Sequence, residues 1–278
     1  LAGAHQYNQI LFRTAWKASD DGQKILEELI PRQSSTEFSY LYFLLSEKRT
    51  PEALAVWKRI AASPEAFNPA QAAGFMDHLF TARLPGEAAQ VWNDLRSKGI
   101  IKPTYQPTAQ NLLVNGDFEE EILNAGFDWR IAKVEGVNVA PDRSTFHSPS
   151  RSLQISFIGK TNLAYSGVYQ YVRVEPNRSY RLRGFLKTDG ITTDSGLRLQ
   201  VHDLYDSAQL QKLSESITGT TGGWTQVVLD FTTGGKTELV VLSVMRLPSA
   251  KLDNLIAGRV WLDDVSLSEL SVAPAHTR

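Results

Sequence analysis

Residues 168–190 read VYQYVRVEPNRSYRLRGFLKTDG, and this stretch decides the fold of the second half of the chain. Side chains alternate before the EPNRS turn, with Val168 and Val172 on one side and Tyr171 on the other. A period of two residues is that of a β-strand with one covered face. After the turn, the run SYRLRGFLK alternates in the same way. The stretch therefore predicts two neighbouring antiparallel strands.

The same alternation recurs on both sides of this stretch. The segments GLRLQVHDL, WTQVVLDFTT, ELVVLSVMRL and GRVWLDDVSL all show it, and turn clusters such as TTDSG and TGTTGG separate them. About eight to ten short strands at this spacing are typical of an all-β sandwich or jelly roll. We therefore expect a jelly roll over residues 111–270.

The first hundred residues follow a different pattern. Residues 1–100 contain 15 Ala and 2 Val, whereas residues 111–278 contain 9 Ala and 16 Val. Alanine favours helices and valine favours strands, so the fold class changes near residue 105. We expect an all-α region over 1–100, a proline-containing linker over 101–110 and a short tail over 271–278.

Internal spacing in the helical region indicates helical hairpins. Pro51 and Pro85 are 34 residues apart, and each opens an apolar helical run. The Val-Trp pairs ending at Trp57 and Trp92 are 35 residues apart, and Gly99 is expected to end the last helix. Helix pairs at this period resemble tetratricopeptide-type repeats. Both tryptophans are expected to pack between helices.

Composition excludes several classes of protein. The 278 residues carry a net charge of −1, which gives no general attraction for nucleic acid. There is no cysteine, so disulfides and thiol chemistry are excluded. No apolar run approaches the roughly 18 residues of a membrane span. The chain begins with Leu1, and we expect it to be a processed or trimmed form.

Six segments, in order, carry a resemblance to a known family. They are NLLVNGDFEE (111–120), GFDWR (126–130), HSPSRSLQISF (147–157), the stretch 168–190, GGWTQVVLDFTT and VWLDDVSLSEL. Residues 111–270 thereby resemble the carbohydrate-binding modules of families 4, 9 and 22, which are galactose-binding-like jelly rolls. The resemblance implies an opening strand at 111–120, sugar binding and a location outside the cytoplasm. The helical region is not part of that family.

The resemblance also implies a structural calcium ion that ties the first strand to the last. It suggests Glu119 and Asp263 as side-chain ligands and Asp117 through its carbonyl oxygen. The loop from Ser148 to Arg151 would supply further carbonyls, because calcium takes six to eight oxygen ligands. Without the resemblance, the same Asp and Glu side chains would be interpreted as solvent-exposed residues at the ends of strands.

Outward-facing residues of the middle strands form the candidate sugar site. Aromatic rings stack on sugar rings, and planar polar side chains bind hydroxyl groups. Seven of the eight candidate residues are expected to share one face, because they alternate with apolar residues along their strands. The eighth is Trp129, because the family commonly has a tryptophan at that position. The candidate ligand-binding residues are Trp129, Tyr169, Tyr171, Arg181, Arg183, Arg198, Gln200 and His202. The arginines favour an anionic glycan.

Enzyme motifs are absent from the sequence. There is no GxSxG elbow, and the GKT at 159–161 lacks the first glycine of a phosphate-binding loop. The sequence therefore predicts non-catalytic binding of a polysaccharide or oligosaccharide, with the helical region contacting a protein partner.

Three alternatives stay open at this point. The outer Tyr and Arg side chains form cross-strand pairs on a solvated face, or the helical half covers that face. In the second case the protein is a scaffold whose jelly roll binds no sugar. A glycan-active enzyme is the third alternative, because paired carboxylates assemble in space rather than in sequence.

Overall fold

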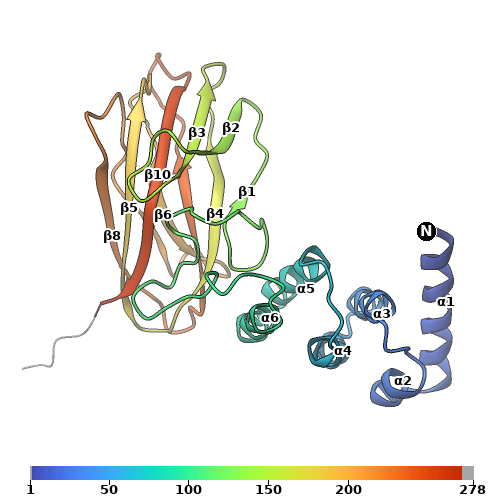
Figure 1. Cartoon of the computed structure of the whole chain (residues 1–278). Coiled ribbons are helices and arrows are strands. Elements are labelled where there is room, and N and C mark those ends of the chain that lie inside the picture. The colour runs from blue at the N-terminus through green and yellow to red at the C-terminus, as the bar shows by residue number, and fades with distance from the viewer. Residues whose placement is uncertain (1, 271–278) are drawn as a thin grey trace, which may run out of the picture. The chain divides into compact units, whose positions relative to one another are not determined.

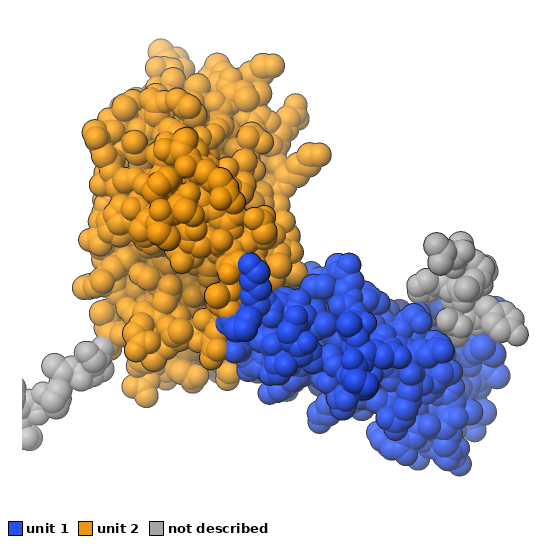
Figure 2. Space-filling model, viewed as in Figure 1, with its two compact units in different colours: residues 1–103 blue, residues 104–278 orange. Residues whose placement is uncertain are grey.

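The structure, a computed structural model, describes residues 2–270, with side chains from residue 9 onward. The predicted tail at 271–278 lies outside these residues. The chain divides into two compact units, residues 1–103 and 104–278 (Figure 2). We call them the helical unit and the sandwich unit. The division falls inside the predicted linker at 101–110.

The described part of the helical unit holds six helices (Figure 1). They are α1 (Ala2–Ala18), α2 (Gly22–Glu28), α3 (Ser34–Ser46), α4 (Thr50–Ala62), α5 (Ala70–Thr81) and α6 (Pro85–Ser97). Helix α3 packs on α4 and α5 packs on α6, which is the predicted arrangement of helical hairpins. A tetratricopeptide-type identity for these helices stays a prediction.

The sequence signals in the helical unit have their expected roles. Pro51 and Pro85 lie in the first turns of α4 and α6, where a proline costs no intrahelical hydrogen bond. Gly99 follows α6 with a φ of 68°, a left-handed conformation that suits glycine. Trp57 and Trp92 are buried, so their predicted packing role is confirmed.

The sandwich unit contains ten strands within its described residues. They are β1 (Arg130–Ile131), β2 (Val137–Asp142), β3 (Ser152–Ile158), β4 (Tyr165–Arg173), β5 (Ser179–Asp189), β6 (Arg198–Asp203), β7 (Gln211–Leu213), β8 (Thr225–Thr232), β9 (Leu239–Arg246) and β10 (Ala257–Glu269). Sheet one has the order β1-β4-β9-β6-β7, and sheet two has the order β2-β3-β10-β5-β8. All neighbouring strands are antiparallel, so the predicted jelly-roll sandwich is confirmed.

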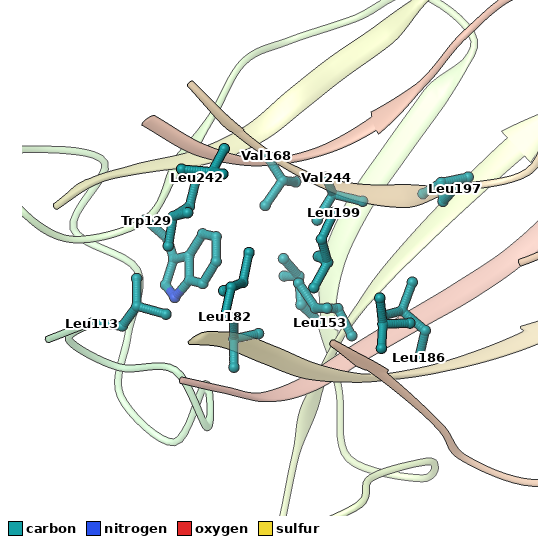
Figure 3. Packing of buried hydrophobic residues seen from close by; sticks show 14 of the residues in the cluster. Leu113, Trp129, Leu153, Val168, Leu182, Leu186, Leu197, Leu199, Leu242 and Val244 are labelled. Atoms are coloured by element: carbon teal, nitrogen blue, oxygen red, sulfur yellow. The ribbon is translucent and has the colours of Figure 1, made fainter. Parts of the chain in front are cut away.

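The core lies between the two sheets and follows the alternation read from the sequence. Val168 and Val172 of β4 face Leu182 and Leu186 of β5 across the same buried cluster. Figure 3 shows Trp129 within this cluster, among aliphatic side chains that include Leu113, Leu182 and Leu242. Each sheet therefore covers one face with the core and leaves the other face outward.

The expected opening strand at 111–120 is not a strand, and this prediction is wrong. Asn115 and Phe118 have φ values of 52° and 54°, outside the strand region, so the backbone turns there. The segment still lies beside β10, because Leu112 N–H donates to Leu267 O at 2.8 Å. On its other side, the buried amide of Gln170 exchanges two hydrogen bonds with the backbone of Val114. Side-chain hydrogen bonds thus replace part of a strand ladder.

The second half of the predicted linker belongs to the sandwich unit. Tyr105 is buried, and its hydroxyl donates to the backbone carbonyl of Glu121. Thr104 donates to the carboxylate of Glu120 at 2.9 Å. Thr104 and Tyr105 therefore tie the second half of the predicted linker to this unit.

Candidate functional site

The outer face of sheet one brings together five of the predicted ligand-binding residues. Strand β9 runs between β4 and β6, and Tyr169 and Gln200 both pair with Ser243. In the next outward row, Tyr171 and His202 both pair with Val241. Arg198 lies on β6 in the same outward series. We call this surface the tyrosine face; it comprises Arg130, Tyr169, Tyr171, Arg173, Arg198, Gln200, His202, Val241, Ser243 and Met245.

Aromatic rings dominate one side of the tyrosine face. The rings of Tyr169 and Tyr171 have centroids 5.7 Å apart and are inclined at 61°. The guanidinium of Arg130 lies 5.0 Å from the centre of the Tyr171 ring, a distance that allows a cation–π interaction. Both tyrosines are partly exposed, so part of each ring can contact a ligand.

Polar groups follow on the other side. The Ser243 hydroxyl donates to the Gln200 amide oxygen at 3.1 Å. Neither His202 Nδ1 nor Arg198 Nε has a hydrogen-bond partner among the described residues. Burial lowers the pKa of His202, which favours the neutral imidazole at pH 7. A neutral imidazole can donate and accept, as hydroxyl recognition requires.

The prediction of one shared face is wrong for two arginines. Arg181 and Arg183 lie on β5, which belongs to sheet two, so they are on the opposite side of the sandwich. Arg181 is held there by Asp230, with nitrogen–oxygen distances of 2.6 and 2.7 Å. Strand parity indicates which residues of one strand share a side, but it does not indicate which sheet the strand joins.

Trp129 has a structural position instead of a surface position. Its side chain is only 1% exposed, and its ring lies 5.1 Å from that of Phe118. Its indole N–H donates to the carbonyl of Asn115 at 2.9 Å. The ring therefore belongs to the core and to neither outer face.

The predicted calcium ligands lie around one loop, at residues 147–151. Glu119 accepts hydrogen bonds from the backbone N–H groups of Ser150 and Arg151, both at 3.0 Å. Asp263 accepts from the N–H groups of His147 and Ser148, at 2.7 and 3.1 Å. These contacts join the opening segment and β10 to the same loop. We call this arrangement the clasp.

The side chain of Arg151 supplies a cation inside the clasp. It is 3% exposed, donates to the carbonyl of Phe118 and pairs with Glu121 at 2.8 Å. The loop thus presents N–H donors to the carboxylates, where calcium requires oxygen ligands. Within residues 9–270, no group of three or more His, Asp or Glu side chains is arranged to hold a metal. Asp117 is exposed, and among the described residues it accepts one hydrogen bond, from Glu119 N–H at 3.3 Å. Calcium at this position stays a prediction.

The structure also contains a groove that the sequence did not indicate. It has a volume of about 640 Å³ and lies between the segment 104–120 and the outer face of sheet two. Arg183 and Phe185 of β5 line it, together with Gln226 of β8 and Ser266 of β10. Its walls come from four separate parts of the chain, so no local pattern could reveal it. We call it the linker groove.

Sequence comparison assigns the chain to a family. The family described as carbohydrate binding domain matches residues 110–250, and the chain belongs to that family. The match covers the opening segment, strands β1 to β9 and every residue of the tyrosine face. A jelly-roll module of this family is non-catalytic.

Curated relatives match 60% of the chain. The tRNA nuclease WapA of Bacillus subtilis is 27% identical over 172 residues, which are 60% of this chain and 7% of that protein. A tRNA3(Ser)-specific nuclease WapA of Bacillus spizizenii matches with the same identity and shares. The chain therefore spans 7% of the length of these relatives.

Solved structures similar to this chain include carbohydrate-binding modules. A family 16 carbohydrate binding module is 21% identical with a TM-score of 0.41, covering 57% of this chain and 100% of that one. A structure titled "CBM4 structure and function" is 16% identical with a TM-score of 0.40, covering 57% of this chain and 99% of that chain.

Among the described helices, none combines the length and apolar character needed to cross a membrane.

Proposed function

We propose that the sandwich unit binds an acidic polysaccharide on its tyrosine face, without chemical change to the ligand. The observation that carries the proposal is the adjacency of the two tyrosine rings to Gln200 and His202 across β9. Aromatic rings cover the apolar face of a sugar, and the amide and imidazole hydrogen-bond its hydroxyls. Membership of the carbohydrate binding domain family supports the same ligand class.

The charge of the tyrosine face favours an acidic ligand. Arg173 and Arg198 lie on the outward side of β4 and β6, and Arg130 lies beside Tyr171. The outward positions of β4, β6 and β9, all described, carry no carboxylate. Guanidinium groups bind carboxylates in a planar two-bond geometry, so a uronate-containing chain fits this surface.

The other parts of the proposal concern the whole chain. We propose that the helical unit contacts a protein partner, which is supported by the exposed side chains of Ile10, Leu11 and Leu29. A location outside the cytoplasm follows from the proposed ligand class alone. A scaffold without sugar binding is the rival, and the test below separates the two.

Replacing Tyr171 tests the proposed function. We expect the whole chain to bind uronate-containing polysaccharides on a glycan array, and Tyr171→Ala to weaken this binding about tenfold or more, because a stacking surface is lost. Leu252→Ala is the matched control, since Leu252 is fully exposed in a loop outside both sheets. An array without binding, or equal binding by Tyr171→Ala, would favour the scaffold.

A further inference from the structure

The linker groove lies on the side of the sandwich opposite the tyrosine face. Its volume of about 640 Å³ is within the roughly 300–1,000 Å³ of small-ligand sites. The segment 104–120, green in Figure 1, forms one wall, and residues of β5, β8 and β10 form the rest. The groove therefore has the size and the walls of a binding site, and it shares no residue with the tyrosine face.

An aromatic cluster stands at one side of the groove. The Phe185 ring lies in the groove and stacks on His147, with centroids 3.8 Å apart and planes inclined at 16°. Trp224 meets the edge of His147 at 5.7 Å. The His147 ring is further fixed by a hydrogen bond to Asp264. Phe185 is thus held in one orientation, which lowers the entropic cost of stacking a ligand on it.

Free polar groups surround this ring. Arg183 is exposed and makes no ion pair or side-chain hydrogen bond with any described residue, whereas Arg181, two residues earlier, is tied to Asp230. Gln226 lies opposite Phe185 in the β5–β8 register, and Ser266 lies opposite Arg183 in the β5–β10 register. A guanidinium, an amide and a hydroxyl are therefore available beside the ring to bind hydroxyl groups.

The acids of the groove select against an anionic ligand. Glu119 and Asp264 are held by the loop at 147–151, and Glu120 accepts from Thr104. With the exposed Asp117, four carboxylates line the groove against the single guanidinium of Arg183. Like charges placed together cost free energy, so a neutral ligand fits better than an acidic one.

We propose that the linker groove is a second carbohydrate site, which takes a short neutral oligosaccharide or the end of a neutral glycan chain. This inference takes its ligand class from the proposed function, but it rests on different residues and on the opposite charge preference. One module then holds two different glycans, one on each side of the sandwich.

The test uses the whole chain and two sets of variants. Cellotetraose, xylotetraose and mannotetraose are titrated by calorimetry, alongside an oligogalacturonate of equal length. We expect at least one neutral tetrasaccharide to bind, and Arg183→Ala combined with Gln226→Ala to weaken it about tenfold or more. Both side chains are exposed, so these changes leave the core intact. Arg181→Ala, on the same face but outside the groove lining, is the matched control.

Tyr171→Ala separates this inference from the proposed function. We expect it to weaken the oligogalacturonate and leave the neutral tetrasaccharide unchanged. Neutral binding that is lost in Tyr171→Ala but kept in the groove variant overturns the second site and leaves the proposed function standing. Absence of any neutral binding overturns the second site as well. If the groove variant alone changes binding, the second site stands and the tyrosine face is refuted.

Discussion

Asp128, which directly precedes Trp129 in the chain, is a fully buried carboxyl group. Burial raises its pKa to about 7, although Leu123 N–H donates to it at 2.6 Å. In an unfolded chain the pKa of the same group is about 3.9. Because the folded state holds the proton more tightly, the contribution of Asp128 to stability is complete below about pH 4 and is lost as the pH rises through 7.

We therefore expect the stability of the sandwich unit to fall between pH 5 and pH 8 partly through this one group. Urea unfolding at both pH values measures the fall, and Asp128→Asn should reduce it because an amide does not titrate in this range. An equal fall in the variant would show that Asp128 keeps an ordinary pKa. Asp263, whose pKa burial raises to about 6, adds to the fall in the same direction.

The clasp gives a prediction about the loop at 147–151. Backbone N–H groups donate to Glu119 and the Arg151 guanidinium donates to Phe118 O, so we expect these contacts to contribute to the thermal midpoint. Arg151→Met should lower it, since buried acceptors lose their donor. Arg143→Met, an exposed change nearby, is the control. Equal midpoints for Arg151→Met and Arg143→Met would contradict this expectation, and a chelator-induced fall that added calcium restores would support the calcium ion implied by the family resemblance.

The opening segment and β10 approach each other closely at Gly116. A Cβ atom at this position would lie 2.0 Å from the carbonyl oxygen of Val265, whose own N–H donates to Gly116 O at 2.8 Å. We expect Gly116→Ala to lower the free energy of unfolding by about 1–3 kcal/mol, as overpacking does. Gly222→Ala is the control, because a Cβ there meets nothing within 4 Å. Equal thermal midpoints for the two variants would contradict this account.

Much of the architecture could be predicted from the sequence because it depends on local periodicity. The alternation around Val168 and Leu182 indicated the buried sides of β4 and β5, and the burial of these residues agrees. The assignment of strands to sheets could not be predicted in this way. It depends on which strands pair with β9. Arg183 and His202 both point outward from their own strands, but these strands belong to different sheets, so the two residues lie on opposite sides of the sandwich.

The candidate site was predicted in part for the same reason. Tyr169, Tyr171, Gln200 and His202 lie together because β4 and β6 both flank β9. Trp129 has the residue type of a ligand contact, but its burial depends on the irregular segment that places Asn115 O within 2.9 Å of its indole nitrogen. The linker groove is formed by tertiary contacts between distant parts of the chain, so it could not be predicted from local sequence patterns.

The hydrogen bond from Leu112 to Leu267 places the entry and the exit of the sandwich unit side by side. A domain with adjacent ends can be inserted into a loop of another protein, or strung between other domains, without spreading the host chain apart. One backbone contact thus gives the sandwich unit the close ends that insertion into another chain requires.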